Sequence, residues 1–422
     1  MYHWYKLFTY LLYPFSPFYL YLRKLRKKED DERYKEKLSI IDLPRGGGTL
    51  IWLHFASVGE AMSVIPLIEN FVEEKKIDKI LLTSITLSSG KILEKKFQGN
   101  EKVIHQFLPL DIPVFIKKFL DHWKPNLSIF VDSEIWPNLI LQINKQKIPL
   151  VLVNARITKK TYKRWNFFIN FANKIFSKFD LCLASNKESE KFLETLGAKN
   201  VKNYGNLKFS NTNNSANINL EDSFISKVQN KKIWCSASTH EPEEILCAKT
   251  HIEIKKKHKD ILTIIIPRHI DRVAEINKEL LKLDLKVVLS SNLIEFNFDT
   301  DILLVDSYGK SLKFYNIAKY VFVGKSLVKS LINDSGQNPI EPAKLGCKIF
   351  HGPYVSNFIE VFDYLKNLGI TKEVNNYKEL SVVLLNEFDK NVDKNYQIKS
   401  KIEDYGQNIF DNVIIELKKY IK

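Results

Sequence analysis

The fold is decided by Phe322-Val323-Gly324-Lys325-Ser326-Leu327, followed by Ser335-Gly336-Gln337-Asn338-Pro339-Ile340-Glu341-Pro342-Ala343 and by Gly352-Pro353-Tyr354. This segment predicts an apolar strand ending at Val323, a loop, a helix that opens at Pro339, and another strand near 348–350. Such a turn offers backbone N–H groups to an anion. Glu341 lies just inside the predicted helix, where its carboxylate suits the dipole or accepts hydrogen bonds from a ribose. Taken alone, the segment is equally an ordinary strand-turn-helix junction.

The same alternation of strand and helix extends through most of the chain. Short apolar runs predict strands at Leu50–His54, Ile80–Thr83, Leu127–Val131, Leu150–Asn154, Leu181–Ala184, Ile233–Ala237, Leu262–Ile266, Lys286–Leu289, Ile302–Val305, Tyr320–Val323 and Lys348–Phe350. Helical patterns lie between these runs, for instance at Ala61–Lys75 and Pro113–His122. Strict alternation favours parallel sheets that are covered on both faces.

A polar stretch divides this alternation into two halves. Residues 211–219 are rich in Asn, Ser and Thr, which is the composition of a linker. We therefore predict two Rossmann-like α/β domains, at 38–210 and 223–422, joined by a linker at 211–222. Two such domains that face each other would place the carboxyl ends of both sheets at a central cleft, where open α/β sheets bind ligands.

Composition bounds the class of protein. The chain has 422 residues, 45% of them hydrophobic and 27% charged, which is typical of a globular protein with room for two domains. The formal net charge of +15 favours anionic partners such as nucleic acid, phosphorylated substrates or an anionic membrane. No recognition motif of a known nucleic-acid module is present. The cysteines show neither metal spacing nor a disulfide framework, which indicates a reducing compartment; they are Cys182, Cys235, Cys247 and Cys347.

Residues 1–28 have the composition of a membrane anchor. The run from Trp4 to Leu22 is rich in aromatic residues and leucine, and basic residues follow it from Arg23 to Lys28. A run of about 19 residues approaches the length that crosses the hydrocarbon of a bilayer. Pro14 and Pro17 weaken a straight spanning helix, while the Tyr and Trp side chains favour a segment at the interface. No cleavage site follows, so we expect a retained anchor. An apolar helix packed on the protein body is the alternative.

Polar residues gather where the predicted strands of the first domain end. Ser57-Val58-Gly59-Glu60 opens a helix after the first strand, and Asp132-Ser133-Glu134 follows the strand at Leu127–Val131. Glu60 is either an acidic residue that complements the helix dipole or a general base that faces the cleft. Asp132 either contributes to the same site or caps the helix that follows.

The second domain has basic residues at the corresponding places. Ser238-Thr239-His240-Glu241 ends one predicted strand, and Pro267-Arg268-His269 ends the next. Arg268 beside a helix start suits a phosphate or carboxylate ligand, because guanidinium and free N–H groups converge there. A surface salt bridge is its alternative role. His269 is a ligand, a cap or a packing residue.

These motifs together resemble the bacterial 3-deoxy-D-manno-octulosonic acid (Kdo) transferases, and they occur in the family's order over nearly the whole chain. The motifs are Ala56-Ser57-Val58-Gly59-Glu60, Leu108-Pro109-Leu110-Asp111, Asp132-Ser133-Glu134-Ile135-Trp136-Pro137-Asn138, Asn154-Ala155-Arg156, Gly205-Asn206-Leu207-Lys208-Phe209, Ala237-Ser238-Thr239-His240-Glu241, Pro267-Arg268-His269, Phe322-Val323-Gly324, Asn338-Pro339-Ile340-Glu341-Pro342 and Gly352-Pro353. Each motif is weak evidence by itself, but ten in order are specific.

The resemblance implies a GT-B glycosyltransferase fold and transfer of Kdo from CMP-Kdo to a lipid A precursor at the cytoplasmic face of the inner membrane. It further implies inversion at the anomeric carbon without a bound metal or another cofactor. Glu60 would be the general base, supported by Asp132, Glu134 and Lys208. The CMP moiety would be held by Arg268, His269, Gly309, Lys310, Ser311, Ser335, Gly336, Gln337, Asn338 and Glu341.

Three positions depart from the family's pattern. Asp132 stands where the family usually has Glu, Gln337 stands where a histidine is frequent, and Lys325 replaces a glycine. The bulk of Lys325 bears on how closely a donor can approach the backbone there. Two other functions remain open on the residues alone: a GT-B transferase or epimerase that uses another nucleotide sugar, and a membrane-docked binding protein without catalytic activity. The oligomeric state and the number of Kdo residues added are not predicted.

Overall fold

A computed structural model describes residues 1–210, 219–330, 335–390 and 396–421. The chain divides into two compact units, and each is described by itself. Unit 1 comprises Met1–Asn211 and Tyr405–Lys422, and unit 2 comprises Thr212–Asp404. Most of the predicted linker, residues 211–218, lies outside the described residues. The predicted cleft between two domains stays a prediction.

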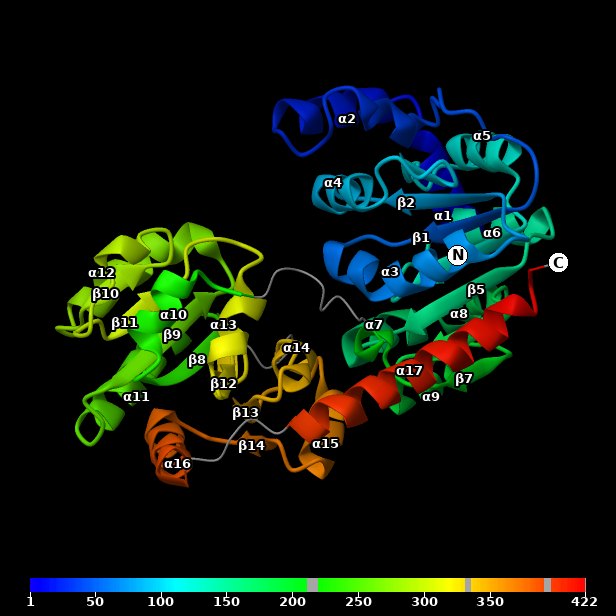
Figure 1. The fold of residues 1–422 in the computed structure, drawn as a ribbon. Helices are drawn as coiled ribbons and strands as arrows, with labels where there is room; N and C mark the ends of the chain where they lie inside the picture. Colours follow the sequence, from blue (N-terminus) through cyan, green and yellow to red (C-terminus); the bar gives the residue numbers. More distant parts are fainter. Residues whose placement is uncertain (211–218, 331–334, 391–395, 422) are drawn as a thin grey trace. The chain divides into compact units, whose positions relative to one another are not determined.

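Unit 1 is built on a seven-stranded parallel sheet with the strand order β3-β2-β1-β4-β5-β6-β7 (Figure 1). Its strands are β1 (Leu50–His54), β2 (Lys79–Ser84), β3 (Val103–Phe107), β4 (Leu127–Val131), β5 (Leu150–Ala155), β6 (Leu181–Ala184) and β7 (Val201–Asn203). All five residues of β1 are buried, because both faces of the sheet are covered. The order is that of a doubly wound fold, so the predicted α/β class is confirmed.

Helices cover the sheet of unit 1. They are α3 (Val58–Glu73), α4 (Leu87–Lys96), α5 (Pro113–Trp123), α6 (Pro137–Lys145), α7 (Lys159–Asn166), α8 (Ile169–Phe176), α9 (Lys187–Thr195) and the 3₁₀ helix η2 (Leu207–Phe209). One hydrophobic cluster joins Trp52 of β1 to Phe119 and Trp123 of α5, and also includes residues of α6 and α8. Trp52 packs against Phe119 with ring centroids 5.0 Å apart. This apolar core fixes the strand ends that carry the polar motifs.

The last helix, α17 (Tyr396–Lys418), returns to unit 1 with its second half. Lys202 and Tyr204 both donate to Oε1 of Glu416, and Lys418 pairs with Glu74 at 3.0 Å. A Cβ on Gly406 would meet the carbonyl oxygen of Phe209 at 2.2 Å, so this close approach requires glycine. The sequence prediction had placed residues 405–422 in the second domain, and the structure corrects that part of the boundary.

Unit 2 contains a second seven-stranded parallel sheet with the order β10-β11-β9-β8-β12-β13-β14. Its strands are β8 (Lys232–Thr239), β9 (Ile261–Pro267), β10 (Val287–Leu289), β11 (Ile302–Leu304), β12 (Tyr320–Val323), β13 (Lys348–His351) and β14 (Thr371–Glu373). Its helices are α10 (Asp222–Val228), α11 (Glu243–Lys255), α12 (Val273–Leu281), α13 (Ser311–Ile317), α14 (Ile340–Lys344), α15 (Ile359–Asn367) and α16 (Tyr377–Lys390), with the 3₁₀ helices η3 (Ile270–Arg272) and η4 (Leu293–Glu295). All four cysteines of the chain are free and buried, as small hydrophobic residues would be.

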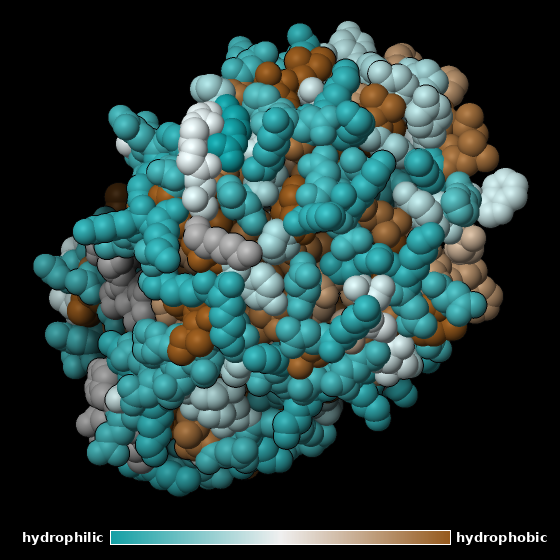
Figure 2. All heavy atoms as spheres, turned by 90° about the vertical axis from the view of Figure 1, so that its right-hand side faces the viewer, coloured by the Kyte–Doolittle hydropathy of each residue, from teal (hydrophilic) through white to brown (hydrophobic). Residues whose placement is uncertain are grey.

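The amino terminus forms two helices of ten residues, α1 (Tyr2–Leu11) and α2 (Ser16–Leu25). Many of their large apolar side chains are exposed, including Trp4 at 74%, Phe15 at 68% and Phe18 at 65%. Hydrophobic residues gather toward the top of the face drawn in Figure 2, the level at which α2 lies in Figure 1. Within the described part of the chain, no helix combines the length and apolar character needed to cross a membrane.

Polar contacts hold α1 against unit 1. The hydroxyl of Tyr5 donates to Oδ2 of Asp111 at 2.8 Å, and the side-chain amide of Asn138 donates to the hydroxyl of Thr9 at 2.9 Å. Asp111 also accepts from the backbone N–H groups of Asn138 and Leu139, so it caps α6. Burial raises the pKa of Asp111 to about 6, although these donors act in the opposite direction. Two motifs of the sequence analysis, Leu108–Asp111 and Trp136–Asn138, therefore fasten α1.

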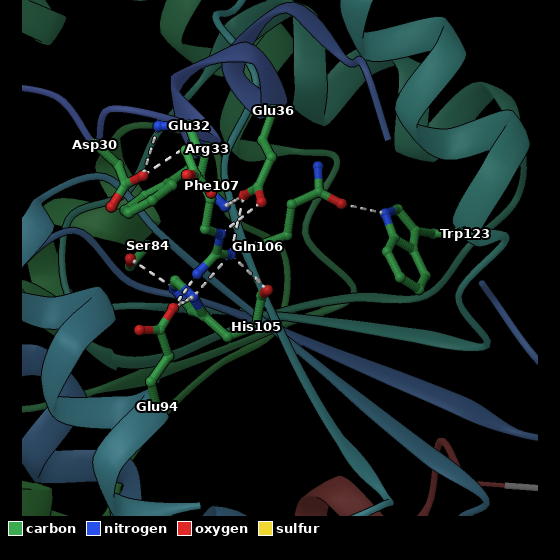
Figure 3. A network of polar contacts seen from close by, with 10 residues as sticks. All are labelled: Asp30, Glu32, Arg33, Glu36, Ser84, Glu94, His105, Gln106, Phe107 and Trp123. Atoms are coloured by element: carbon green, nitrogen blue, oxygen red, sulfur yellow. Dashed lines mark hydrogen bonds and ion pairs between the residues drawn. The ribbon is translucent and has the colours of Figure 1, made fainter. Parts of the chain in front are cut away.

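The 3₁₀ helix η1 (Arg33–Leu38) is fastened to the edge strand β3 by a second network (Figure 3). The guanidinium of Arg33 binds both carboxylate oxygens of Glu36, the carboxylate of Glu94 and the backbone carbonyl of His105. Burial lowers the pKa of His105 to about 3, and the charge of Arg33 acts in the same direction. The neutral imidazole of His105 contacts the hydroxyl of Ser84 at 2.9 Å. This network connects the amino-terminal segment to the sheet.

Candidate active site

The strand order of unit 1 reverses between β1 and β4, which are neighbours although β2 and β3 intervene in the sequence. At such a point the loops after the two strands diverge and leave a crevice at the carboxyl ends. The loop after β1 leads to Glu60, and the loop after β4 carries Asp132 and Glu134. The structure therefore brings these three carboxylates, which the sequence analysis singled out, to one edge of one sheet.

Glu60 lies in the first turn of α3 and forms a reciprocal cap with Ser57. The Ser57 hydroxyl accepts from the backbone N–H of Glu60 and donates to its Oε1 at 3.0 Å, while the N–H of Ala56 donates to its Oε2 at 2.7 Å. Burial raises the pKa of Glu60, the Ala56 N–H opposes this shift, and the negative charges of Asp132 and Glu134 add to it. Both interpretations of Glu60 thus describe the same half-buried side chain, which caps a helix and faces other carboxylates.

Asp132 follows β4 in a left-handed backbone conformation with φ of 61°, which is uncommon for a residue other than glycine. Its N–H donates to the carbonyl of Val153, and its own carbonyl accepts from the N–H of Arg156. Burial raises the pKa of its carboxyl, while the positive charges of Lys208 and Arg156 oppose that shift. The alternative role of Asp132 as the cap of α6 is wrong, because Asp111 fills that role.

Glu134 is 9% exposed and receives two donors on one oxygen. The indole N–H of Trp136 donates to Oε2 at 2.8 Å, and Nε2 of His54 lies 3.1 Å from the same atom. His54 is fully buried, and its Nδ1 contacts the hydroxyl of Thr83 at 3.0 Å. Sequence analysis placed His54 inside a strand and assigned it no role. Its position at the last residue of that strand, before the polar motif, was the available signal.

Lys208 belongs to η2, which lies in the loop after β7 and is held in place by a contact with β5. The side-chain oxygen of Asn154, itself in a left-handed conformation with φ of 53°, accepts from the N–H of Leu207 at 3.0 Å. Burial lowers the pKa of Lys208, Asp132 and Glu60 act to raise it, and Arg156 acts to lower it. Two cations therefore face three carboxylates. Arg156 was quoted within a motif without a role, and only the fold shows that it acts on Asp132.

The second sheet reverses its strand order between β8 and β12, and a buried carboxylate joins the loops after them. Glu243, the first residue of α11, is 0% exposed. Its Oε2 accepts from the N–H groups of Lys325 at 2.6 Å and His240 at 3.1 Å. Its Oε1 accepts from Ser326 at 2.9 Å and Leu327 at 3.0 Å. The turn after β12 does offer N–H groups to an anion, as predicted, but an internal anion occupies them.

Hydrogen bonds hold together the three motifs between Phe322 and Tyr354 with which the sequence analysis began. The N–H of Gly336 donates to the carbonyl of Lys325 at 2.6 Å, and the N–H of Tyr354 donates to the carbonyl of Ser326 at 2.9 Å. The N–H of Gly352 donates to Oγ of Ser326 at 2.9 Å. A Cβ on Gly352 would meet the carbonyl oxygen of Ser326 at 2.0 Å, which explains why glycine is required. The loops at the carboxyl ends of β12 and β13 are thus joined to each other by hydrogen bonds.

Arg268 and His269 are exposed at the end of β9, beside the half-buried His240. The N–H of Arg268 donates to the carbonyl of Thr239 at 3.0 Å, and the rings of His240 and His269 lie 5.4 Å apart. Burial lowers the pKa of His240 to about 4, and the charges of Lys325, His269 and Arg268 act in the same direction. This edge of unit 2 therefore gathers cationic and imidazole side chains, which suits an anionic ligand.

The other predicted donor-binding residues lie in two segments of the same unit. Gly309 has φ of 78° in the turn before α13, Lys310 is the N-cap residue of that helix and Ser311 opens it. Ser335 is buried with its hydroxyl 2.9 Å from that of Ser356. Asn338 accepts from the N–H of Ile340 and caps α14. Gln337 is half-buried and Glu341 is exposed, and α13 packs against α14.

The two edges can support different chemistry. In unit 1, burial and the charges of neighbouring carboxylates raise the pKa of Glu60 and Asp132 and so favour their protonated forms, which suits proton transfer. Unit 2 presents positive charge, which suits binding of an anion. Within the part of the chain that the structure describes, no three His, Cys, Asp or Glu side chains are arranged to hold a metal ion.

Comparison with known sequences identifies similar proteins over most of the chain. The family model described as 3-deoxy-D-manno-octulosonic-acid transferase matches residues 32–211. A 3-deoxy-D-manno-octulosonic acid transferase from Rickettsia bellii (strain RML369-C) is 31% identical over 420 residues, which cover 94% of this chain and 98% of the relative. The enzyme of the same name from Haemophilus influenzae is 31% identical over 328 residues, covering 77% of this chain and 75% of the relative.

Comparison with solved structures supports the fold alone. A glycosyltransferase from Rickettsia africae matches with a TM-score of 0.59 at 11% identity, and the match covers 89% of this chain and 100% of that chain. A UDP-GlcNAc 2-epimerase from Neisseria meningitidis matches with a TM-score of 0.57 at 16% identity, covering 88% and 100%. With a glycosyltransferase among these neighbours and two parallel α/β sheets in the chain, the predicted GT-B class is confirmed for the fold; the membrane anchor that was part of that prediction is not.

Proposed function

Because the chain belongs to the family of 3-deoxy-D-manno-octulosonic acid transferases, we propose that it transfers Kdo from CMP-Kdo to a lipid A precursor, lipid IVA. The transfer inverts configuration at the anomeric carbon and uses no bound metal. In this proposal unit 1 activates the acceptor and unit 2 binds the donor.

The observation that carries the proposal is the group of carboxylates and cations at the carboxyl edge of β1 and β4. An inverting transfer needs one base that takes the proton of the attacking hydroxyl. We assign that base to Glu60, because burial and the charges of Asp132 and Glu134 raise its pKa toward the range in which a base works well. Each carboxylate oxygen of Glu60 accepts one hydrogen bond from its own turn and keeps a further lone pair for the acceptor.

The neighbouring residues would tune and orient this base. Asp132 repels the charge on Glu60, and Lys208 balances both carboxylates when one of them gains or loses a proton. Glu134 is held by His54 and Trp136, so we assign it a positioning role toward the acceptor rather than proton transfer. Asp132, Glu134 and Lys208 then support the transition state around Glu60.

The leaving group of the donor is a nucleotide monophosphate, CMP. The leaving group does not need a proton, but its negative charge must be stabilised. We assign this to the exposed cationic edge of unit 2 at Arg268 and His269, with the turn at Gly309–Ser311 and the segment Ser335–Asn338 holding the rest of CMP. Fixed cations and oriented dipoles stabilise such charge without a metal. Glu341 is exposed in the first turn of α14 and would accept hydrogen bonds from the ribose.

We further propose that the protein lies at the cytoplasmic face of the inner membrane through α1 and α2. Their exposed side chains include Trp4, Phe8 and Phe18, and Arg23 and Lys24 lie in the last turn of α2. Aromatic side chains settle at the boundary between headgroups and hydrocarbon, and nearby basic residues are attracted to anionic lipids. Such a surface would bring the site to an acylated, phosphorylated acceptor.

The test is transfer itself. Purified protein in detergent is incubated with freshly generated CMP-Kdo and a tetra-acylated lipid A precursor, and the lipid is analysed by mass. We expect a gain of one or more Kdo units, at a rate that is unchanged by a metal chelator and at least about 100-fold lower in Glu60→Gln. A lipid of unchanged mass, with CMP still protecting the protein against heat, would indicate another acceptor or sugar. Protection by UDP and not by CMP would instead favour the alternative of a different nucleotide sugar.

A further inference from the structure

Two arginines, Arg268 and Arg272, flank the turn after β9, and their surroundings differ. The Arg268 side chain is exposed and has no ion-pair partner among the described residues. The Arg272 side chain is only 19% exposed, and three carboxylates surround its guanidinium. The salt bridge that the sequence analysis considered for Arg268 is thus formed by Arg272 instead.

The three carboxylates around Arg272 differ in burial. Glu244 is 1% exposed, and its Oε1 accepts from Nη1 of Arg272 at 3.3 Å. Glu241 and Glu275 lie 3.8 Å and 3.6 Å from the guanidinium, and their side chains are 71% and 57% exposed. Solvent screens exposed pairs, whereas a buried carboxylate left without its cation is costly. Glu244 is therefore the partner that fixes Arg272.

This ion pair joins the two loops at the carboxyl ends of β8 and β9. Glu244 lies in the first turn of α11, after the loop that follows β8, and Arg272 ends η3, after β9. The N–H of Arg272 donates to the carbonyl of His269 at 3.2 Å, and the N–H of Arg268 donates to the carbonyl of Thr239 at 3.0 Å. Residues 268–272 are thus tied to the neighbouring loop at both ends, by the backbone at Arg268 and by a side chain at Arg272.

We propose that Glu244 and Arg272 are positioning residues, whose ion pair fixes the turn that presents Arg268 and His269 to the phosphate of the CMP-sugar. This inference rests on the proposed function and adds to it two residues that act through others. A turn that is ordered before binding spends less free energy on being ordered by the ligand, so it binds the phosphate more tightly. A small displacement of the same side chains weakens their contacts with the donor.

The experiment compares four variants of the full chain in detergent. Arg272→Ala removes the guanidinium, Arg272→Lys keeps its charge, and Glu244→Gln keeps the size of the buried partner without its charge. Glu275→Gln is the matched control, because it removes an exposed carboxylate beside the same guanidinium. Binding of CMP and of uncharged cytidine is measured by calorimetry, and KM for CMP-Kdo is measured in the transfer assay.

We expect Arg272→Ala and Glu244→Gln each to raise the Kd for CMP and the KM for CMP-Kdo by about tenfold, with the Kd for cytidine unchanged. Arg272→Lys should recover part of this loss, and Glu275→Gln should match the wild type. The sign of the Glu244→Gln effect is diagnostic, because removing a negative charge would by electrostatics alone strengthen binding of an anion.

Three results would overturn the inference. Unchanged or tighter CMP binding in Glu244→Gln, with a loss in Arg272→Ala, would show that Arg272 binds the donor directly. Equal losses for CMP and cytidine would show a general structural role. Wild-type constants in both variants would show no role in donor binding. Failure of the wild type to bind CMP would instead overturn the proposed function, and the inference with it.

Discussion

Glu60 and Glu243 occupy corresponding places in the two units, but their surroundings give them different roles. Each lies in the first turn of the helix that follows the central strand at which the order of its sheet reverses, α3 after β1 and α11 after β8. Each accepts an N–H from its own loop. Glu60 remains half-buried and faces Asp132 and Glu134, whereas Glu243 is fully buried and binds the turn of the neighbouring strand.

The difference comes from the loop after the neighbouring strand. After β4, the left-handed residue is Asp132, and the loop presents carboxylates to Glu60. After β12, the left-handed residue is Lys325, and the loop presents a row of N–H groups to Glu243. A carboxylate that meets N–H groups becomes part of the structure. Burial raises the pKa of both carboxylates. Glu60 differs in that it stays half-buried and faces other carboxylates and a lysine, so it keeps the capacity to exchange a proton.

Glu60→Gln should have the largest effect on activity. We expect transfer to slow by about 100- to 10,000-fold, the usual contribution of a general base. The amide can still take part in the cap with Ser57, so the fold should persist. Single-turnover transfer with excess enzyme measures the rate, and CMP affinity, which we assign to unit 2, serves as the control. A rate within a few fold of the wild type would show that Glu60 is a cap and nothing more.

Glu243→Ala should have the largest effect on stability. It leaves four N–H groups, all at least partly buried, without an acceptor, so we expect a loss of about 3 kcal/mol or more. The matched Glu60→Ala removes a cap and should cost only about 1 kcal/mol. Denaturant unfolding gives both numbers, and hydrogen exchange should accelerate at the amides of 325–327. Equal losses in the two variants would erase the distinction between the two glutamates.

The pH dependence of transfer tests the repulsion between carboxylates. A general base must be ionised to accept a proton, and the pKa of Glu60 is raised. The transfer rate should therefore begin to fall, on acidification, at a higher pH than it would with an ordinary glutamate as the base. Asp132→Asn removes a negative charge that disfavours ionised Glu60. It should therefore move the acidic limb to lower pH, and Asn tolerates the left-handed conformation at this position. A limb that stays in place would mean that Asp132 does not influence the base.

The smallest effect concerns His240 at the other edge. Its imidazole should titrate near pH 4 in a nuclear magnetic resonance experiment, since burial and neighbouring cations disfavour the charged form. Lys325→Gly removes one of these cations and should raise that midpoint slightly. Because the unfolded imidazole takes up its proton at higher pH, this group lowers stability as the pH falls through 6.5 toward 4. A midpoint near 6.5 would show that burial and the neighbouring cations do not disfavour the charged imidazole of His240.

The fold was largely predictable because interior parallel strands are continuous apolar runs. Predicted and observed bounds agree to the residue for β1, β4, β6 and β12. The strands that were not predicted, β3, β7 and β14, all lie at sheet edges. Edge strands face solvent on one side, so they read as mixed sequences such as Thr371-Lys372-Glu373, without an apolar run.

The candidate site was predictable only where a motif directly follows a strand, as at Glu60, Asp132 and Glu134. His54 and Arg156 gain their neighbours from strand adjacency, which no local pattern records. The same holds for the turn at 324–327, because its anion comes from Glu243, 82 residues before Lys325.

Asp111 links the exposed amino-terminal surface to the segment that carries the candidate carboxylates. This residue holds Tyr5 of α1 on one side and the start of α6 on the other. The segment from Asp132 to Asn138 ends at that same cap and spans at most about 25 Å when fully extended. In the membrane-bound state that we propose, the depth of α1 in the lipid surface would set how far above that surface Glu134 stands. An acceptor would be selected by the height of its hydroxyl above its acyl chains as well as by its chemistry.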